Sequence, residues 1–486
     1  MWRAIIILML VGTATQAQGP AAAIVAAAVD VQSLPVAVRQ HVRYLELTDL
    51  LPEERRDFLP ILAYHVNSLS RELDLLPLTV VNADLVRLNL CDYGISPKTW
   101  ERLADADPLL HVRLVREEIQ YQNWGYYQGS SWVTTERRKT GVKKVIVGAL
   151  APWLTETPQQ QQALAYLVQE TQSQAPVVNA LWFFHQSVIQ EGRDGTRTGY
   201  YDFLGLGKKE ADWLELVGGK GVIDQARKLK LELGAAVRRS RRVAIANRQI
   251  RRVQSLTGGL WLTIDVNTSV GERNALRNLL DLKADVTEQI AVLPNGLPAF
   301  WLADGQGNRQ NSAPDSIAGN TAHRGVDTRV HAGPLTCLIC HRTVLHPIQD
   351  YVRDVLARPP MALASPDPDV NKRLRQLYLS DLETRFRRDV EDYATAAARA
   401  TGGLKLEEVA DRYGRFWDLY EADRTVERIS RGVGVPAERI LQALRAQQTA
   451  GTLDPVLAGL LHGEPLRFEH YEESLPTLHV YLRGLP

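Results

Sequence analysis

Apolar residues recur every three or four positions early in the chain and again through its last quarter. Residues 53–75 have this spacing and predict a helix. Ser96-Pro97 predicts the start of another, since serine caps a helix and proline fits its first turn. From residue 371 onward the pattern is helical. The candidate helices there are residues 371–400, 404–431, 436–448, 454–462 and 468–474.

Alternating apolar and polar residues predict short strands between these helical stretches. Residues 85–91 and 258–266 have the pattern of strands. Residues 288–293 and 297–303 predict a hairpin that turns at Pro294-Asn295-Gly296. The fold class expected from these patterns is α+β and mainly helical.

Composition shifts divide the chain into three expected parts after a short leader. Residues 30–310 form a mixed N-terminal domain with short strands and the hairpin. Residues 311–365 are loop-rich and end in a stiff linker with several prolines. Residues 366–486 form a helical C-terminal domain.

Residues 120–150 combine aromatic and basic side chains. Four aromatic residues are followed closely by the basic cluster Arg137-Arg138-Lys139, and residues 142–150 predict a strand. The aromatic residues are Trp124, Tyr126, Tyr127 and Trp132. Such interleaving could bind nucleic acid, but we favour a packed β-excursion because the chain begins like an exported protein.

Residues 227–252 carry ten basic side chains and one acidic side chain, Glu232. A run of this kind is usually one solvated face of a helix, which is our expectation here. The functional alternatives are pairing with anionic groups of a cofactor and docking of an acidic partner. Over the whole chain, 57 basic residues balance 56 acidic ones, so no net field favours nucleic acid.

The first 17 residues have the layout of a secretory signal peptide. Arg3 is followed by an apolar stretch, and Thr15-Gln16-Ala17 fits a cleavage site. The alternative is an uncleaved anchor, since residues 21–28 are also apolar. We expect an exported chain, periplasmic in a bacterium, with no transmembrane segment in its mature form.

Cys337, Cys340 and His341 form the pattern C-x-x-C-H, which attaches a c-type haem. Two thiols spaced in this way can add to the two vinyl groups of a porphyrin, and the adjacent imidazole can then ligate the iron. Only 3 cysteines occur in the chain, and two of them lie in this motif. Export strengthens the haem hypothesis, because this haem is attached after export. The third cysteine, Cys91, is expected to be a partly buried, inert thiol.

Two other uses of the motif remain open. Zinc could bind Cys337 and Cys340 together with His341 or His346, with His331 as a further ligand. The two cysteines could also form a disulfide.

The sixth iron ligand would decide between a closed electron carrier and an open site. Met361, in a proline-stiffened strap after the motif, is one candidate, although an ordinary linker methionine has the same pattern. His185 is another, in the apolar and aromatic stretch 177–189, where a hydrogen-bonded core histidine is the common alternative. His323 and His331 are weaker candidates near the motif.

Several stretches together resemble a family of exported c-type haem proteins of planctomycete-type bacteria. They are HVNSLSRE near residue 65, LVRLNLCDYGISPKTWERL at 85–103, LPNGLPAFWLADGQGNR at 293–309, HAGPLTCLICH at 331–341 and LRFEHYEESLP at 466–476. Leu338-Ile339 stands where family members often carry methionine, and Cys91 where many have arginine. The resemblance implies a cytochrome c-like protein with one haem, and no particular substrate.

The expected function is therefore covalent haem binding and electron transfer with a redox partner protein. The first alternative is an open-site haem enzyme or sensor, with peroxidase-like activity or binding of a diatomic gas. The second is a structural zinc site at the motif.

Overall fold

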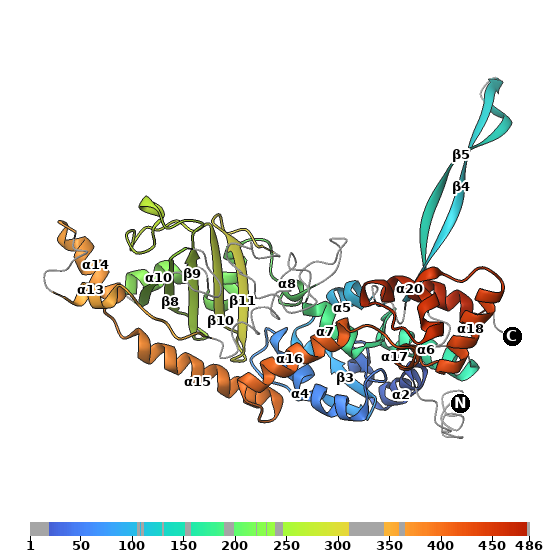
Figure 1. Cartoon of the computed structure of the whole chain (residues 1–486), viewed down its shortest axis with the longest axis horizontal. Helices are drawn as coiled ribbons and strands as arrows, with labels where there is room; N and C mark the ends of the chain where they lie inside the picture. Colours follow the sequence, from blue (N-terminus) through green and yellow to red (C-terminus); the bar gives the residue numbers. More distant parts are fainter. Residues whose placement is uncertain are drawn as a thin grey trace. The chain divides into compact units, whose positions relative to one another are not determined.

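The structure is a computed structural model. It describes residues 19–104, 107, 111–128, 131–150, 157–188, 199–219, 221–229, 231–238, 246–310, 345–358 and 365–483, with backbone alone for 111–128 and 131–150. The described chain is mainly helical with antiparallel sheets, so the predicted α+β class is confirmed (Figure 1). No described helix is long and apolar enough to cross a membrane.

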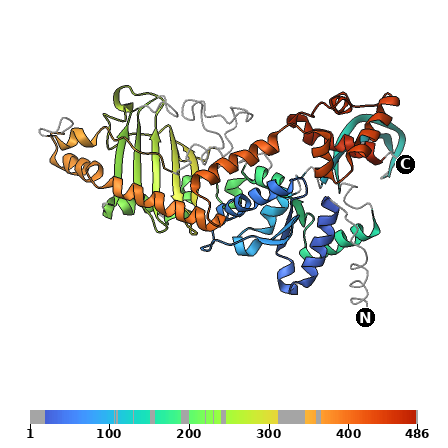
Figure 2. The ribbon, with the colours of Figure 1, turned by 60° about the horizontal axis from the view of Figure 1, so that its bottom comes forward.

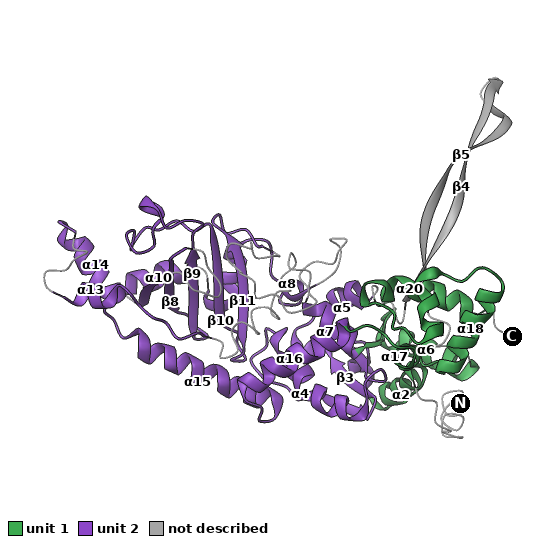
Figure 3. Cartoon of the chain, viewed as in Figure 1, with its two compact units in different colours: residues 1–34, 105–179, 422–486 green, residues 35–104, 180–421 purple. Residues whose placement is uncertain are grey.

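The chain forms two compact units, and neither is a continuous stretch of sequence (Figure 3). Unit 1 contains residues 1–34, 105–179 and 422–486; unit 2 contains residues 35–104 and 180–421. This grouping differs from the predicted domains, because residues 366–421 belong with unit 2 and the rest of the C-terminal helices with unit 1.

Unit 1 is built mainly from helices. Its described elements are α2 (Pro20–Ser33), β4 (His111–Gln128), β5 (Ser131–Leu150), α6 (Pro158–Thr171), β6 (Val177–Asn179), α17 (Val426–Val433), α18 (Ala437–Thr449), α19 (Pro455–Ala458), η4 (Gly459–His462) and α20 (Phe468–Arg483). The apolar run at residues 21–28 falls in α2, where Ile24, Ala27 and Val31 are buried. That helix therefore supplies core to unit 1.

One part of unit 2 packs helices on a small antiparallel sheet. Strands β2 (Thr79–Asn82), β3 (Leu85–Asn89) and β1 (Val42–Glu46) are neighbours in that order. The nearby elements are α3 (Val36–Arg39), α4 (Pro52–Ser68), η1 (Leu90–Tyr93), α5 (Pro97–Ala104), α7 (Ala180–Val188), α8 (Tyr200–Phe203) and α16 (Leu406–Glu421). Aromatic rings on α4, α7 and α16 form the core between these helices, as Phe58 contacts both Phe184 and Phe416.

The other part of unit 2 is a five-stranded antiparallel sheet in the order β11-β10-β9-β8-β7. Its strands are β7 (Glu232–Val237), β8 (Arg248–Gln254), β9 (Gly259–Asp265), β10 (Val286–Val292) and β11 (Pro298–Asp304). The remaining elements are α9 (Glu210–Gly218), α10 (Val222–Leu229), η3 (Gly271–Arg273), α13 (Arg353–Ala357), α14 (Pro368–Tyr378) and α15 (Leu382–Thr401). Helix α15 runs across the strands (Figure 2).

A buried ion pair joins α15 to this sheet. The guanidinium of Arg252 on β8 donates to both carboxylate oxygens of Asp389 on α15, at 2.7 and 2.9 Å. The indole of Trp261 on β9 donates to the same carboxylate at 2.8 Å. Gly259 permits this approach, because a Cβ there would lie 2.1 Å from the Asp389 Oδ2 atom. Among the described residues, the side chains that donate to this buried carboxylate come from the sheet.

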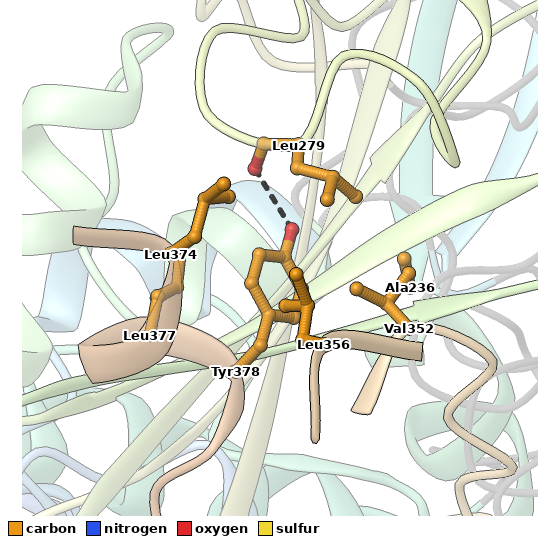
Figure 4. Close-up of a cluster of buried hydrophobic side chains, with 7 residues drawn as sticks. All are labelled: Ala236, Leu279, Val352, Leu356, Leu374, Leu377 and Tyr378. Atoms are coloured by element: carbon orange, nitrogen blue, oxygen red, sulfur yellow. Dashed lines mark hydrogen bonds between the residues drawn. The ribbon is translucent and has the colours of Figure 1, made fainter. Parts of the chain in front are cut away.

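A separate apolar cluster packs α13 and α14 against the sheet and the loop before β10 (Figure 4). Its members are Ala236, Leu279, Val352, Leu356, Leu374, Leu377 and Tyr378. The Tyr378 hydroxyl donates to the Leu279 carbonyl at 2.8 Å, so the polar group of this fully buried ring is satisfied.

The arginine-rich run is where the predicted structure is wrong. Residues 232–237 and 248–254 are adjacent antiparallel strands, not one solvated helix face. Arg251 and Arg252 are only 5% and 3% exposed. Their partners, Tyr378 and Asp389, lie far along the chain. Cys91 also differs from expectation, since it is exposed in η1.

Candidate functional site

The residues predicted to hold haem lie outside the described residues. These are Cys337, Cys340 and His341, together with the candidate ligand Met361 and the nearby His323 and His331. The donor set itself fits covalent haem, because the two thiols would supply both attachment points and the adjacent imidazole would ligate the iron. The structure describes the chain up to residue 310 and again from residue 345, so it fixes both ends of the segment that carries the motif.

The first end is fixed at the edge strand β11. The backbone N–H of Gln310 donates to the Leu302 carbonyl at 2.9 Å, and that of Arg309 donates to Lys208 at 2.9 Å. The Arg309 guanidinium carbon lies 5.0 Å from the centre of the Tyr201 ring, a cation–π distance. The chain therefore enters the motif segment from a firmly bonded turn.

The second end is fixed at the opposite edge strand, β7. Leu345 is buried, and five residues later Asp350 accepts a hydrogen bond from the Ala236 N–H at 3.1 Å. The N–H of Tyr351 donates to the Ala236 carbonyl at 3.0 Å. Since neighbouring strands are about 4.8 Å apart, the two edges of five strands are about 19 Å apart. The segment that carries the motif therefore begins next to one edge of this sheet and returns to the other edge.

His185, predicted as a possible distal ligand, lies in the core of unit 2 and is 3% exposed. Its Nε2 atom is 3.2 Å from the Glu421 carboxylate, and its Nδ1 atom is 3.1 Å from the Gln186 amide. The ring lies against those of Trp417 and Tyr420, tilted by 31° and 33°, with centroids 3.9 and 4.3 Å away. Iron ligation would require one of these nitrogens to leave its partner, so the contacts favour the hydrogen-bonded core role.

A second buried histidine, which sequence reasoning missed, lies at the centre of unit 2. His65 on α4 has no exposed surface. Its Nδ1 atom is 2.6 Å from the Tyr413 hydroxyl of α16, and its Nε2 atom is 2.6 Å from the Ser187 hydroxyl of α7. The rings of Phe183 and Phe184 contact it edge-on. One imidazole thus joins three helices.

The hydrogen bonds determine which nitrogen of His65 carries the proton. The Ser187 hydroxyl donates its one hydrogen to the Phe183 carbonyl at 2.6 Å, so its oxygen must accept from His65 Nε2–H. Nδ1 is then the acceptor for the Tyr413 O–H. Burial lowers the pKa of His65 to about 3 and raises the pKa of Tyr413 well above its ordinary value. Both groups are therefore neutral over the physiological range.

A third polar cluster lies on the five-stranded sheet. Arg248 Nε is 2.7 Å from an Asp265 carboxylate oxygen, and its Nη1 is 3.9 Å from Glu288. The Thr263 hydroxyl donates to Asp265 at 3.1 Å. Desolvation raises the pKa of Glu288 to about 7; Arg248 opposes the shift and Asp265 adds to it. One arginine shared by two carboxylates can thus leave a proton on Glu288 near neutral pH.

The His65 and Arg248 clusters had little signal in the sequence. His65 falls in the stretch HVNSLSRE, but Tyr413 is 348 positions away and Ser187 is 122 away. Arg248 lies in the basic run that the sequence assigned to a solvated helix. The spacing of apolar residues and the local composition cannot identify hydrogen-bond partners that lie so far apart in the sequence.

Within the described residues, no group of three or more histidine, cysteine, aspartate and glutamate side chains is arranged to hold a metal ion. Comparison with known proteins adds no relative: no family model, no curated protein and no solved structure matches the chain.

Proposed function

We propose that the chain is an exported c-type cytochrome-like protein that carries one covalent haem and transfers electrons to or from a redox partner protein. The observation that carries the proposal is the C-x-x-C-H motif at Cys337, Cys340 and His341 in a chain that begins like a secreted precursor. When bound, the haem iron supplies the one-electron chemistry, and the protein supplies attachment, orientation and tuning of its potential.

The fixed ends of the motif segment support this proposal. An electron carrier benefits from a cofactor held in constant geometry, and hydrogen bonds at Gln310 and Ala236 hold both ends on one sheet. The same anchoring would serve a structural zinc site. An experiment is therefore needed to distinguish haem iron from zinc.

Counting thiols in the denatured protein tests covalent attachment directly. The mature chain contains three cysteines, so two thioether links leave one free thiol, that of the exposed Cys91. We expect exported protein to keep its colour in acidified acetone and to titrate as one thiol. A matched Cys91→Ala variant should keep the haem and titrate as none, whereas Cys337→Ala should lose the normal double attachment.

Colourless exported protein with three titratable thiols and bound zinc would contradict the haem proposal. Metal analysis of the same sample identifies that outcome. Zinc with all three cysteines free after denaturation would establish the alternative of a structural site.

The visible spectrum of the reduced protein with and without CO separates a carrier from an open-site enzyme or sensor. A carrier with two axial ligands should show a sharp low-spin spectrum that CO leaves unchanged. Rapid CO binding would instead favour the open-site alternative. Met361→Ala tests the proposed distal ligand, since an unchanged spectrum and potential would remove Met361 from that role.

A further inference from the structure

The strands β4 and β5 of unit 1 form one long antiparallel hairpin whose residue types change along its axis. Near its base, aliphatic residues pair across both faces, as in Leu114 with Val147 and Val115 with Ile146. Because neighbouring residues of a strand lie on opposite faces, these two pairs occupy opposite faces of the ribbon. The base is thus apolar on both faces.

The middle of the hairpin is charged on both faces. Glu117 is opposite Lys144, and Glu118 is opposite Lys143, so opposite charges pair on each face. Further along, beyond a register shift after Gln120, the basic residues Arg137, Arg138 and Lys139 are opposite Asn123, Gln122 and Tyr121. This collar of three basic residues has no acidic residue opposite it.

The end of the hairpin is aromatic on both faces. Tyr127 is opposite Trp132 on one face, and Tyr126 is opposite Val133 on the other. Trp124 precedes them on β4. A ribbon that packs one face on its own protein is expected to be apolar on that face and polar on the other. In this hairpin the two faces have similar residue types at each level, and the residue types change from the base to the end.

We propose that this hairpin binds the surface of an anionic lipid bilayer end-on, with its aromatic end in the headgroup region and its basic collar among the lipid phosphates. Trp and Tyr are the residues enriched at the membrane–water boundary. Lys and Arg next to them attract anionic headgroups. From Trp124 to Gln128 the strand extends about 13 Å at 3.3 Å per residue. This length is less than half of the hydrocarbon core of about 30 Å, so the aromatic end is too short to cross a bilayer.

The charge excess agrees with an anionic partner. Residues 117–144 contain five basic side chains, Arg137, Arg138, Lys139, Lys143 and Lys144, and three acidic ones, Glu117, Glu118 and Glu136. The acidic pair sits opposite Lys143 and Lys144, farther from the aromatic end than the collar. Glu136 is opposite Trp124, so the three basic residues of the collar and this one acidic neighbour leave a net charge of +2 next to the aromatic end.

Vesicle co-sedimentation of the full mature protein tests the proposal. We expect binding to vesicles of phosphatidylcholine mixed with phosphatidylglycerol, weaker binding to phosphatidylcholine alone, and loss of binding at high salt. Replacing the collar (Arg137→Gln, Arg138→Gln, Lys139→Gln) should weaken binding about fivefold per residue, on the order of a hundredfold in all. Trp124→Ser with Trp132→Ser should abolish binding to both vesicle types.

The matched control removes the same charge elsewhere. Arg385, Arg387 and Arg388 are exposed on α15, so their triple change to Gln should leave vesicle binding within twofold of the wild type. Equal loss in the control and collar variants would overturn the proposal, as would absence of vesicle binding by folded wild-type protein. A change of oligomeric state in the Trp variants, measured by light scattering without lipid, would also contradict the proposal. It would show that the hairpin binds a second copy of this chain and not a membrane. The haem spectrum is independent of all these outcomes.

Discussion

At the scale of single residues, the His65 cluster shows how a buried imidazole can serve as structure without acting as a charge. Each of its nitrogens has one partner of the opposite hydrogen-bonding type, and the chain of donors ends at the Phe183 carbonyl. Satisfied buried polar groups fix one arrangement of the surrounding elements, because any other arrangement leaves a donor or acceptor unpaired. The three helices α4, α7 and α16 are thereby held in register.

Removing the Tyr413 hydroxyl should destabilise unit 2. Tyr413→Phe leaves the buried His65 Nδ1 without a donor, which costs about 1–3 kcal/mol. Tyr393→Phe is the matched control, since Tyr393 is equally buried but its hydroxyl has no hydrogen-bond partner among the described residues. Urea unfolding of both variants measures the difference. Equal free energies of unfolding would contradict the assigned hydrogen bond.

The neutrality of His65 should also appear in the pH dependence of stability. Its pKa is about 3 in the folded protein and about 6.5 when unfolded, so between these values the unfolded chain binds the extra proton. The stabilising contribution is complete above pH 6.5 and is lost as the pH falls, at up to about 1.4 kcal/mol per pH unit.

Unfolding free energies measured between pH 7 and pH 4 test this, with His65→Gln as the comparison. The variant should have the shallower slope, because its side chain does not titrate. His479, whose pKa is lowered to about 4, contributes a pH dependence of its own in both proteins, so the variant should keep part of the slope. Parallel slopes would contradict a depressed His65 pKa.

Residue-scale chemistry can be predicted from sequence only where it is local. The C-x-x-C-H pattern supports a haem prediction because its chemistry depends on three residues within five positions, and this prediction lies outside the described residues. The prediction for Cys91 failed because β3 ends at Asn89, so the alternation of the strand does not extend to the cysteine. His185 could be recognised as a candidate on an aromatic wall, but its partners Glu421 and Trp417 come from a helix more than two hundred residues away.

At the scale of elements, the buried pair of Arg252 and Asp389 decides how α15 sits on the sheet. Both charges are removed from water, and the geometry is bidentate. Breaking such a pair costs more than the pair itself contributes, because the remaining charge stays buried. The contact therefore selects one register of α15 on β8 and β9.

Asp389→Ala should accordingly cost about 3–5 kcal/mol in the free energy of unfolding. The same helix offers a control: Glu383 pairs with Arg387 at 3.0 Å, and both side chains are largely exposed. Glu383→Ala should cost about 0.5 kcal/mol or less. Chemical denaturation of the two variants compares the buried and exposed pairs, and a similar loss in both would contradict the role of Asp389.

Most elements followed from the spacing of apolar residues. The hairpin at 288–303 is confirmed as β10 with β11. The strand at 85–91 and the helix at 53–75 are confirmed in type as β3 and α4, but they end earlier, at Asn89 and Ser68. The predicted helix at 371–400 is two helices, α14 and α15. The strand expected at 142–150 is the end of β5. The arginine-rich strands could not be predicted, because charged side chains normally indicate exposure to solvent. Asp389, the partner that allows Arg252 to be buried, lies 137 positions away in the sequence.

At the scale of the whole molecule, the chain passes between the two units four times. Neither unit therefore consists of one uninterrupted stretch of sequence. For this reason the domain boundaries predicted from composition differ from the boundaries of the two units. The sequence could indicate where helices and linkers lie. It could not indicate that residues 1–34 and 422–486 belong to one unit.

Deleting residues 422–486 should unfold unit 1 selectively. The deletion removes α17 to α20, which belong to the same compact unit as α2 and α6, and leaves α2 and α6 with only the rest of that unit to pack against. Hydrogen exchange should show loss of protection in α2 and α6 and retained protection in β7 to β11. Retained protection in α2 and α6 would contradict the assignment of the terminal segment to unit 1.

Each outer strand of the five-stranded sheet has hydrogen-bond partners on its outward edge. Tyr200 and Tyr201 hydroxyls accept from the Phe300 and Leu302 N–H groups of β11, at 3.3 and 3.2 Å, and the segment at 350–351 occupies β7 at Ala236. An uncovered outer strand invites a foreign strand to extend the sheet and begin a fibril. Here two phenols and one carboxylate already occupy hydrogen-bonding positions on the outer strands, so a foreign strand has fewer free backbone groups with which to extend the sheet.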